Sequence, residues 1–248
     1  LANKMNNYWL DIGYEYAGWQ KQDNALGIQS VIEKALSTIH KEPVSITASG
    51  RTDAKVHAYG QVFHFEGLDS MNGHQYVQAL NTLLDPSIRI VDVVAVSDQF
   101  HARFSAIYKR YDYICTFDQD DPFAYRRKHR LFKPLNVENM KEGAQYLLGT
   151  HDFTSFCSSK IEPEKPKTKT ITNISLIEEG KDLRMVFEGN GFLRYQVRMM
   201  AATLIEVGRG KIPPEKVKEI LELKHKEACR YNAPAHALYL VEVGYETS

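Results

Sequence analysis

An arginine and an aspartate two positions apart, Arg51 and Asp53, are the residues of this chain with the clearest potential for chemistry. They lie in a polar, glycine-bounded turn within residues 49–65, between two apolar runs. A carboxylate on a turn between rigid strands has a fixed position, and the neighbouring guanidinium favours its ionised form. Asp53 is therefore a candidate nucleophile. On this short pattern alone, the ordinary interpretation is that Thr52 or Asp53 caps a helix or forms an Asx-turn.

Three further residues combine a suitable side chain with a suggestive position. Tyr111 lies in an alternating stretch with Tyr113 on the same face of a predicted strand, a pattern that favours packing. Arg194 and Arg198 are four residues apart in a predicted helix, so we expect them on one helical face. Their ordinary interpretation is a surface pair that contacts nearby carboxylates.

The histidines and cysteines predict neither a metal site nor a cofactor. No His-x-x-x-His pair occurs, and His64 alternates with two phenylalanines, which is typical of a structural histidine. The cysteines Cys115, Cys157 and Cys229 are odd in number and far apart, which favours neither a disulfide framework nor a zinc site. No glycine-rich phosphate loop of the Walker or Rossmann type occurs. We therefore assign no metal and no cofactor.

The composition is that of a soluble globular protein. The chain has 248 residues, of which 43% are hydrophobic and 25% charged, enough for one sizeable core or two smaller ones. It contains no run of 18 apolar residues and no signal-peptide pattern. We therefore expect no membrane role and a reducing, cytoplasmic location.

The charges are balanced in number but uneven in distribution. There are 31 basic and 31 acidic side chains, which at first argues against a polyanionic partner. Basic residues nevertheless cluster at 126–130 and 165–169, whereas acidic residues concentrate between 215 and 227. If the basic clusters share one face, that face attracts phosphates despite the neutral total. For any single cluster, solvated surface charge explains the pattern equally well.

The periodicity of apolar residues predicts the same order of elements twice. Residues 28–39 repeat at helical spacing, and the other elements of the first half follow as strands or a helix. The first half reads β-α-β-β-α-β, over residues 8–14, 28–39, 44–48, 61–65, 76–83 and 88–96. The second half repeats this order, with an extra helix after Pro213-Pro214, over residues 108–117, 137–148, 168–178, 183–188, 193–207 and 238–245.

This repeated order predicts an α+β protein made of two ferredoxin-like βαββαβ halves with antiparallel or mixed sheets. We place the N-terminal half, with the Asp53 turn, at residues 1–106, and the C-terminal half, with Tyr111 and Arg198, at residues 107–248. A cleft between the two halves is the natural place for a substrate.

The segment Gly-Arg-Thr-Asp-Ala-Lys-Val-His at residues 50–57 closely resembles the signature of the TruA-type tRNA pseudouridine synthases. Other separated blocks resemble blocks of that family in the same order. They lie at residues 13–22, 100–106, 109–113, 148–156 and 191–198, with Gly244-Tyr245 near the end. The resemblance covers nearly the whole chain.

The resemblance implies a role for each candidate residue. Asp53 matches the catalytic aspartate of the family, and Tyr111 matches the tyrosine that stacks on the target uracil. Arg198 matches the arginine that pairs with the aspartate and keeps it anionic. Arg51 matches an arginine that enters the nucleic acid and helps to displace the target nucleotide. The resemblance also implies that the two halves join through their sheets around a central basic cleft.

The implied activity is that of an isomerase that converts uridine to pseudouridine in the anticodon stem-loop of tRNA, at positions 38–40. The family works without an external cofactor, as a homodimer in which each tRNA bridges both subunits. The aspartate attacks the ribose C1′ or the uracil C6, or else extracts a ribose proton, and the sequence leaves these alternatives open.

Four residues depart from the family pattern. Lys55 replaces the usual glycine, Gln196 the usual methionine, and Met199 and Ala202 stand where asparagine and glycine are common. If position 55 requires a positive φ, a β-carbon there costs about 1 kcal/mol. Alternatively, the lysine contacts RNA. These departures are typical of a divergent paralogue, and they bear on the choice of substrate more than on the chemistry.

Two other classes of function stay open at this stage. One is a tRNA-binding or RNA-folding module without turnover, which the Lys55 departure favours and the retained Asp53 disfavours. The other is a hydrolase that cuts a glycosidic bond with a carboxylate pair formed by Asp53 and Asp152.

Overall fold

The computed structural model describes residues 2–6, 15–21, 24–161 and 164–246. The chain forms two compact units. Unit 1 comprises residues 1–107 together with 239–248, and unit 2 comprises residues 108–238. Both contain helices packed on antiparallel or mixed sheets, which confirms the predicted α+β class. The functional division at residues 106 and 107 remains a prediction.

Unit 1 contains a four-stranded antiparallel sheet with the order β2-β4-β1-β5. Its strands are β1 (Ala2–Asn6), β2 (Thr47–Ala48), β4 (Val62–Glu66) and β5 (Asp92–Ala95). Together with two helices they follow the predicted β-α-β-β-α-β order along the chain. The strand predicted at residues 8–14 lies outside the described residues.

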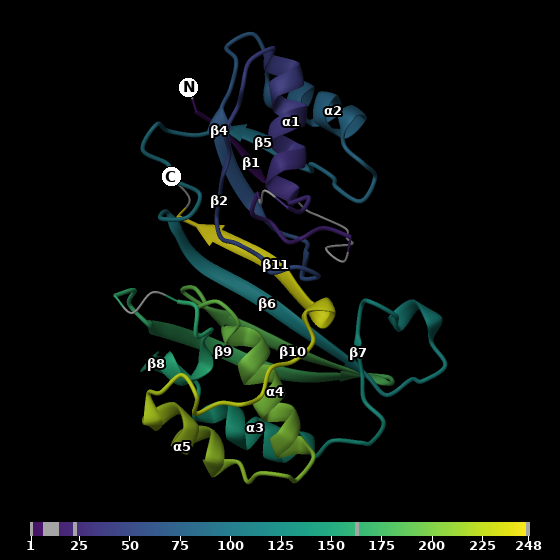
Figure 1. Ribbon diagram of the computed structural model, residues 1–248, viewed down its shortest axis with the longest axis vertical. Helices are drawn as coiled ribbons and strands as arrows, with labels where there is room; N and C mark the ends of the chain where they lie inside the picture. Colours follow the sequence, from purple (N-terminus) through teal and green to yellow (C-terminus); the bar gives the residue numbers. More distant parts are fainter. Residues whose placement is uncertain (1, 7–14, 22–23, 162–163, 247–248) are drawn as a thin grey trace. The chain divides into compact units, whose positions relative to one another are not determined.

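The two helices of unit 1 are α1 (Ile28–His40) and α2 (Gly73–Leu83), and they lie against one face of the sheet (Figure 1). Four residues of the apolar stripe of α1 are buried, as its spacing predicts: Ile28, Ile32, Ala35 and Leu36. α2 begins where the side chains of Asn72 and Gln75 form a capping box. Between helices and sheet, the rings of Phe63, Phe65 and Tyr76 form a fully buried core.

Unit 2 is built on a sheet with the order β6-β10-β9-β8, and a short strand β7 pairs in parallel with β6. The predicted turn at residues 179–182 joins β9 to β10, with Gly180 at φ 63°. A left-handed residue of this kind suits a tight hairpin. The strands are β6 (Ala106–Thr116), β7 (His129–Arg130), β8 (Gly149–Asp152), β9 (Thr168–Glu179) and β10 (Asp182–Gly189).

Three helices lie together on one side of this sheet (Figure 1): α3 (Val137–Gln145), α4 (Gln196–Gly208) and α5 (Glu215–Leu223). α4 is buried around almost its whole circumference, and Gly208 allows the side chain of Met140 in α3 to approach it. α5 is the extra helix predicted after Pro213-Pro214. Short 3₁₀ turns occur at Pro122–Ala124, Thr154–Phe156 and Ala235–Ala237.

The last strand of the chain, β11 (Leu238–Tyr245), belongs to unit 1 from Tyr239 onwards. There it pairs in parallel with β3 (His57–Ala58), with Tyr239 opposite His57. β3 follows directly after the turn that carries Asp53. The C-terminal strand therefore supports the segment with the candidate nucleophile. Among the described residues, no helix has the length and apolar character needed to cross a membrane.

Candidate active site

Asp53 lies at the start of a tight turn in unit 1. The amide of Val56 donates to the carbonyl oxygen of Asp53 at 3.2 Å, which closes the turn. Lys55 has a φ of 71°, so its backbone is in the left-handed region that favours glycine. This chain therefore places a lysine where the glycine usual in the family would fit with less strain. The Asp53 side chain is half-buried and that of Arg51 is exposed. The turn thus presents a carboxylate and a cation at a surface.

The two ends of this loop are tied together by a buried glutamine. The Ser49 hydroxyl donates to Oε1 of Gln61 at 2.7 Å, and Nε2 of Gln61 donates to the carbonyl oxygen of Gly50 at 3.0 Å. The backbone amide of Ser49 also donates to Val62 at 2.7 Å. Because Ser49 and Gln61 are both buried, these bonds are shielded from water. They fix the points from which the loop leaves and re-enters the sheet.

A glycine far away in the sequence packs directly against the loop. Gly18 has a φ of +90°, and a β-carbon there would lie 2.7 Å from the carbonyl oxygen of Thr52 and 3.0 Å from the carbonyl carbon of Asp53. Its neighbour Trp19 donates its amide to Thr52 at 3.2 Å and buries its ring against Phe63. No local pattern in the sequence predicts this support. Its only signal was the position of both residues in a block that resembles the family.

The exit of the loop is held by β11. The ring of Tyr239 stacks on His57 at 4.7 Å and on Tyr59 at 5.3 Å between centroids. The amides of Tyr59 and Gly60 both donate to Leu240, at 2.7 and 3.2 Å. A β-carbon on Gly60 would lie 2.2 Å from the carbonyl oxygen of Val241, so only glycine fits there. The loop is therefore held at its base, its flank and its exit.

Tyr111 lies in the middle of β6 in unit 2, opposite Phe187 of β10. It is half-buried, and its ring meets that of Phe192 edge to face at 5.3 Å. Tyr113, by contrast, is fully buried, and its hydroxyl contacts Nδ1 of His129 and the carbonyl oxygen of Pro234, both at 3.1 Å. The packing interpretation thus holds for Tyr113, while Tyr111 is only half-buried.

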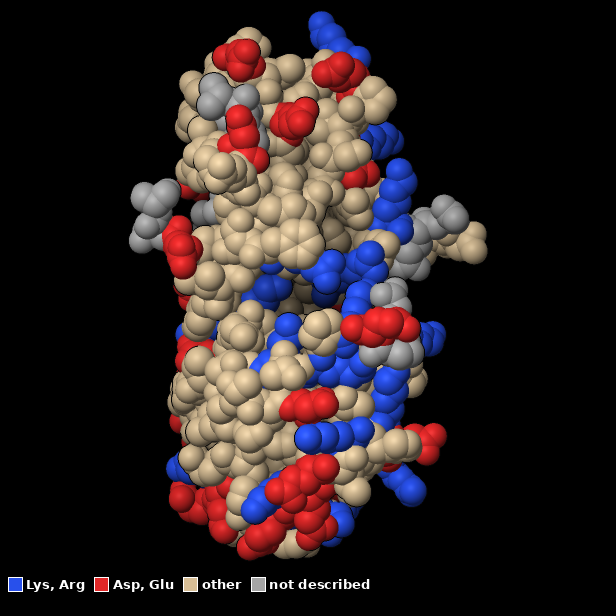
Figure 2. Space-filling view, turned by 90° about the vertical axis from the view of Figure 1, so that its left-hand side faces the viewer, with Lys and Arg blue, Asp and Glu red and all other residues tan. Residues whose placement is uncertain are grey.

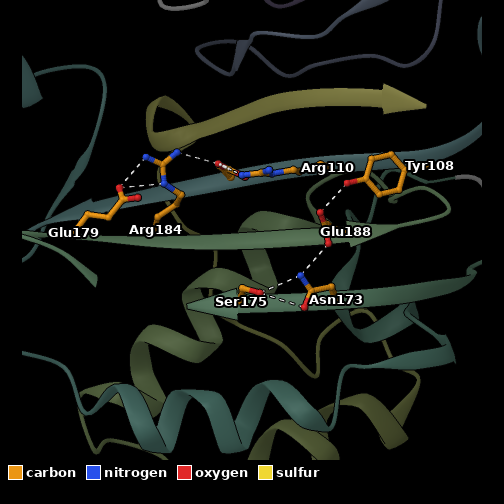
Figure 3. A network of polar contacts seen from close by, with 8 residues as sticks. Tyr108, Arg110, Asn173, Ser175, Glu179, Arg184 and Glu188 are labelled. Atoms are coloured by element: carbon orange, nitrogen blue, oxygen red, sulfur yellow. Dashed lines mark hydrogen bonds and ion pairs between the residues drawn. The ribbon is translucent and has the colours of Figure 1, made fainter. Parts of the chain in front are cut away.

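The side chains before and after Tyr111 lie on the opposite face of the sheet, because side chains alternate along a strand. On that face they anchor β6 to its neighbours. The buried Asp112 carboxylate receives hydrogen bonds from Arg110 at 2.9 Å and from Arg184 of β10 at 3.1 Å. Figure 3 shows Arg184 reaching Glu179 on the same face, and Tyr108 bonded to Glu188. These contacts between strands hold the register that presents Tyr111.

Arg198 lies in the first turn of α4. Its Nε donates to the carbonyl oxygen of Ala233 at 2.8 Å, and its guanidinium lies 4.8 Å from the ring centroid of Tyr195. The guanidinium of Arg194 lies 5.0 Å from the same ring. The expectation that Arg194 and Arg198 share a helical face is wrong, because Tyr195 has a φ of 69° and the helix begins only at Gln196. Both guanidinium groups lie over the Tyr195 ring instead.

The departures in α4 lie mostly inside unit 2. Gln196 is fully buried, and its Oε1 accepts the amide of Leu193 at 2.8 Å, so it closes the turn that leads into the helix. Its Nε2 has no hydrogen-bond partner among the described residues. Met199 is buried and Ala202 half-buried. Gln196 and Met199 therefore alter the packing around Arg198 rather than an exposed surface.

Asp152 is engaged within unit 2. Its Oδ1 accepts the amide and the hydroxyl of Thr154, at 2.9 and 2.6 Å. Burial acts to raise the pKa of Asp152, but these two hydrogen bonds and nearby lysines lower it below its ordinary value. A general acid of a glycosidase needs the opposite shift. Within the described part of the chain, no group of three or more His, Cys, Asp or Glu side chains is arranged to hold a metal ion.

Both basic clusters contain exposed side chains. In the cluster at 126–130, Arg126 and Arg127 are exposed, and Lys128 pairs with Asp182 at 2.6 Å and with Asp121 at 3.7 Å. In the cluster at 165–169, Lys165 is exposed. On the face drawn in Figure 2, Lys and Arg side chains gather in clusters, and Asp and Glu side chains are densest at the lower end of the view.

Comparison with known proteins identifies the family. The profile of the tRNA pseudouridine synthases matches residues 12–105 and 144–246. The tRNA pseudouridine synthase A of Exiguobacterium sibiricum is 43% identical over 238 residues, which cover 95% of this chain and 94% of the relative. The enzyme of the same name from Bacillus subtilis is 41% identical over 237 residues, covering 94% and 96%.

The tRNA pseudouridine synthase A of Chlamydia abortus is 43% identical over 244 residues, which cover 94% of this chain and 88% of the relative. The matched regions contain Arg51, Asp53 and Arg198, while Tyr111 lies between the two regions that the family profile matches. Since both the profile and these relatives cover most of its length, the chain belongs to the tRNA pseudouridine synthase family.

Proposed function

We propose that this chain isomerises uridine to pseudouridine in the anticodon stem-loop of tRNA, at positions 38–40, with Asp53 as the nucleophile. The observation that carries the proposal is the Asp53 turn, which is braced by Gly18, Gln61 and β11 and leaves the carboxylate half-exposed. A nucleophile must keep its position while the substrate moves past it, and such bracing supplies that.

The reaction is an internal rearrangement of the nucleoside. The bond between uracil N1 and ribose C1′ breaks, the uracil turns, and a bond forms between C5 and C1′. The proton on C5 leaves and N1 gains one, so the atoms balance without a redox partner or cofactor. Asp53 supplies its carboxylate to C1′ or to uracil C6, or removes a ribose proton. The target nucleotide must leave its stack for any of these steps.

The other site residues have separate roles in this proposal. Tyr111 offers a flat apolar ring to the displaced uracil, and its contact with Phe192 fixes the orientation of that ring. Arg198 keeps Asp53 anionic; the two residues belong to different units, so their pairing is part of the proposal. Arg51 is exposed, as a side chain that enters the nucleic acid must be. We also propose a cytoplasmic homodimer that binds the tRNA anticodon arm.

Each of the two alternative functions predicts an outcome on tRNA that differs from pseudouridine formation. The hydrolase alternative is disfavoured by Asp152, whose carboxylate is engaged by Thr154 and whose pKa is lowered. A binding module would engage tRNA and leave every uridine intact. A module of that kind does not need a carboxylate turn braced on three sides.

The proposed function is tested on tRNA labelled with tritium at uracil C5, because of the three functions considered only isomerisation releases that label while keeping the base attached. We expect tritium release together with a carbodiimide-dependent stop of reverse transcription in the anticodon arm. Free uracil would instead identify a hydrolase, and binding without either signal would identify a module. The tRNA should come from a strain without this protein, so that its target uridines are unmodified.

A further inference from the structure

Residues 100–105 of unit 1 present an aromatic side chain and a cation to solvent. The Phe104 side chain is 76% exposed, and Arg103 beside it is also exposed. Within residues 100–105 the sequence has one arginine and no acidic residue. A single exposed aromatic residue is common on protein surfaces, so its meaning depends on how it is held.

The backbone of this segment is closed on itself by His101. Nδ1 of His101 accepts the amides of Arg103 and Phe104, at 3.1 and 3.2 Å. The amide of His101 donates to the hydroxyl of Ser105 at 3.0 Å, and the amide of Ser105 donates back to the carbonyl oxygen of His101 at 2.9 Å. Four hydrogen bonds within five residues fix the backbone from which the Phe104 ring projects.

The same segment is attached to the strands that hold the Asp53 loop. Ala102 is fully buried; its amide donates to Nδ1 of His64 in β4 at 3.0 Å, and its carbonyl oxygen accepts the hydroxyl of Tyr245 in β11 at 2.7 Å. The ring of Phe100 meets the rings of His64 and Tyr245 edge to face. Since β4 follows the Asp53 loop and β11 pairs with its exit, Phe104 and Asp53 share one rigid frame within unit 1.

The surroundings of the Phe104 ring are those of a stacking surface. The ring of His101 supports it at 4.3 Å between centroids, with 33° between the planes. The guanidinium of Arg103 lies 5.6 Å from the ring centroid. Proteins hold unpaired nucleotides by stacking bases on such rings and by placing cations near the adjoining phosphates. The exposed cation Arg103 beside the ring favours this polyanionic partner over an uncharged protein surface.

We propose that Phe104 stacks on an unpaired base of the tRNA and that Arg103 contacts the phosphate next to it. This base is distinct from the target uracil, which is assigned to Tyr111. The proposal rests on the proposed function, because it takes tRNA as the substrate. It makes Phe104 a substrate-positioning residue that sets the distance between one unpaired base and the Asp53 turn.

The direct test is a Phe104→Trp variant used as a fluorescent probe. Stacking on a base quenches tryptophan emission, so an anticodon stem-loop RNA should quench the variant, after subtraction of the wild-type signal. A fully paired RNA duplex of equal length should not. Leu83→Trp is the matched control, since Leu83 is 49% exposed in the same unit and lies outside the segment. Equal quenching by the duplex, or equal quenching of the control, would overturn the proposal.

Turnover gives a second readout. Phe104→Ala should raise KM for tRNA by about 10-fold to 100-fold with little change in kcat, because stacking contributes to binding and not to bond making. Phe104→Tyr should restore KM, whereas Phe104→Leu should not. An unchanged KM in Phe104→Ala, or rescue by leucine, would contradict stacking. Because the Phe104 side chain is exposed, we expect these variants to fold like the wild type. Thermal unfolding checks that they do.

The two proposals fail in different ways. If the wild-type protein releases no tritium from tRNA, the proposed function is wrong, while quenching of Phe104→Trp by the stem-loop still shows stacking. If the wild-type protein makes pseudouridine but the probe shows no quenching, only the role of Phe104 is wrong. A change in probe emission with protein concentration alone would assign Phe104 to contact with a second copy of the chain, and would also overturn the proposal.

Discussion

Unit 1 presents Asp53 and Arg51 from an irregular turn, whereas unit 2 presents Tyr111 from the middle of a strand and Arg198 from the first turn of a helix. The turn depends on close approaches by distant backbone, such as Gly18 against Thr52 and Asp53. Tyr111 depends instead on a regular ladder of pairs between β6 and β10. In the ladder, many hydrogen bonds between the strands share the task of holding Tyr111 in position. The position of Asp53 depends on only a few contacts, so activity should tolerate substitutions around the turn of unit 1 less well than substitutions in unit 2.

The largest expected effect is the loss of the carboxylate in unit 1. Asp53→Asn keeps the shape of the side chain but removes its nucleophilic character, so turnover should fall by about 1,000-fold or more while tRNA affinity stays within a few-fold. Tritium release and filter binding measure the two quantities. Asp69→Asn, an exposed acidic residue of the same unit, is the control and should behave as wild type. Residual turnover well above that level would place the chemistry on another residue.

The second prediction compares one glycine from each unit. In Gly18→Ala the new β-carbon would meet backbone atoms at 2.7–3.0 Å with φ at +90°, so the Asp53 turn must shift. A displacement of about 1 Å costs on the order of 100-fold in turnover. In Gly143→Ala the nearest atoms belong to the side chains of Val217 and Leu204, at 3.2 and 3.4 Å, which can move.

Gly143→Ala should therefore keep turnover within about threefold, and alanine offsets part of any packing cost through its better helix propensity, by up to about 1 kcal/mol. Tritium release and thermal unfolding of both variants test the comparison. Equal activity of the two variants would show that the Asp53 turn is as tolerant as unit 2.

This contrast also explains what the sequence could predict. Helix α1 followed from its spacing, and the β9–β10 hairpin followed from the polar turn at Gly180, because both depend on neighbouring residues. The left-handed backbone of Tyr195, which delays the start of α4, has no such local signal. Likewise, the candidate Asp53 was visible in its polar turn, but Gly18 and β11 reach it only through contacts between distant segments. Long-range support of that kind is not encoded in a local pattern.

We expect unit 2 to be sensitive to acid at the contact between Tyr113 and the half-buried His129. Burial, and then the positive charges of Arg209 and His236, lower the pKa of His129 from 6.5 to about 4. The unfolded chain takes up this proton near pH 6.5 and the folded chain only near pH 4. The stabilisation is therefore complete above pH 6.5 and is lost as the pH falls towards 4.

With allowance for solvent access, this loss should amount to about 1–2 kcal/mol. Urea unfolding of the wild type and of His129→Gln, at about pH 7 and about pH 4.5, measures it. The variant should lose less stability on acidification than the wild type. His64 in unit 1 also has a lowered pKa, through burial and then the neighbouring His101, so His64→Gln shows how much of the acid effect belongs to unit 1. Parallel losses in the wild type and His129→Gln would assign the sensitivity to other groups.

The smallest expected effect concerns Lys55, the departure nearest to Asp53. At its φ of 71° a residue with a β-carbon destabilises the fold by up to about 1 kcal/mol, and Lys55→Gly would relieve this strain. Glycine also increases the conformational entropy of the unfolded chain, which destabilises the fold by about 0.4–1 kcal/mol. The two terms nearly cancel, so stability should change by about 0.5 kcal/mol or less. Lys41→Gly is a matched control, since Lys41 has a φ of 61° at the end of α1 and lies outside the Asp53 turn. Both variants should therefore show the same small change in unfolding free energy and retain wild-type turnover.

Binding of tRNA separates the two lysines. If only Lys55→Gly weakens tRNA binding and lowers the dependence of that binding on salt, Lys55 contacts a phosphate. The turn of unit 1 then takes part in binding as well as in chemistry.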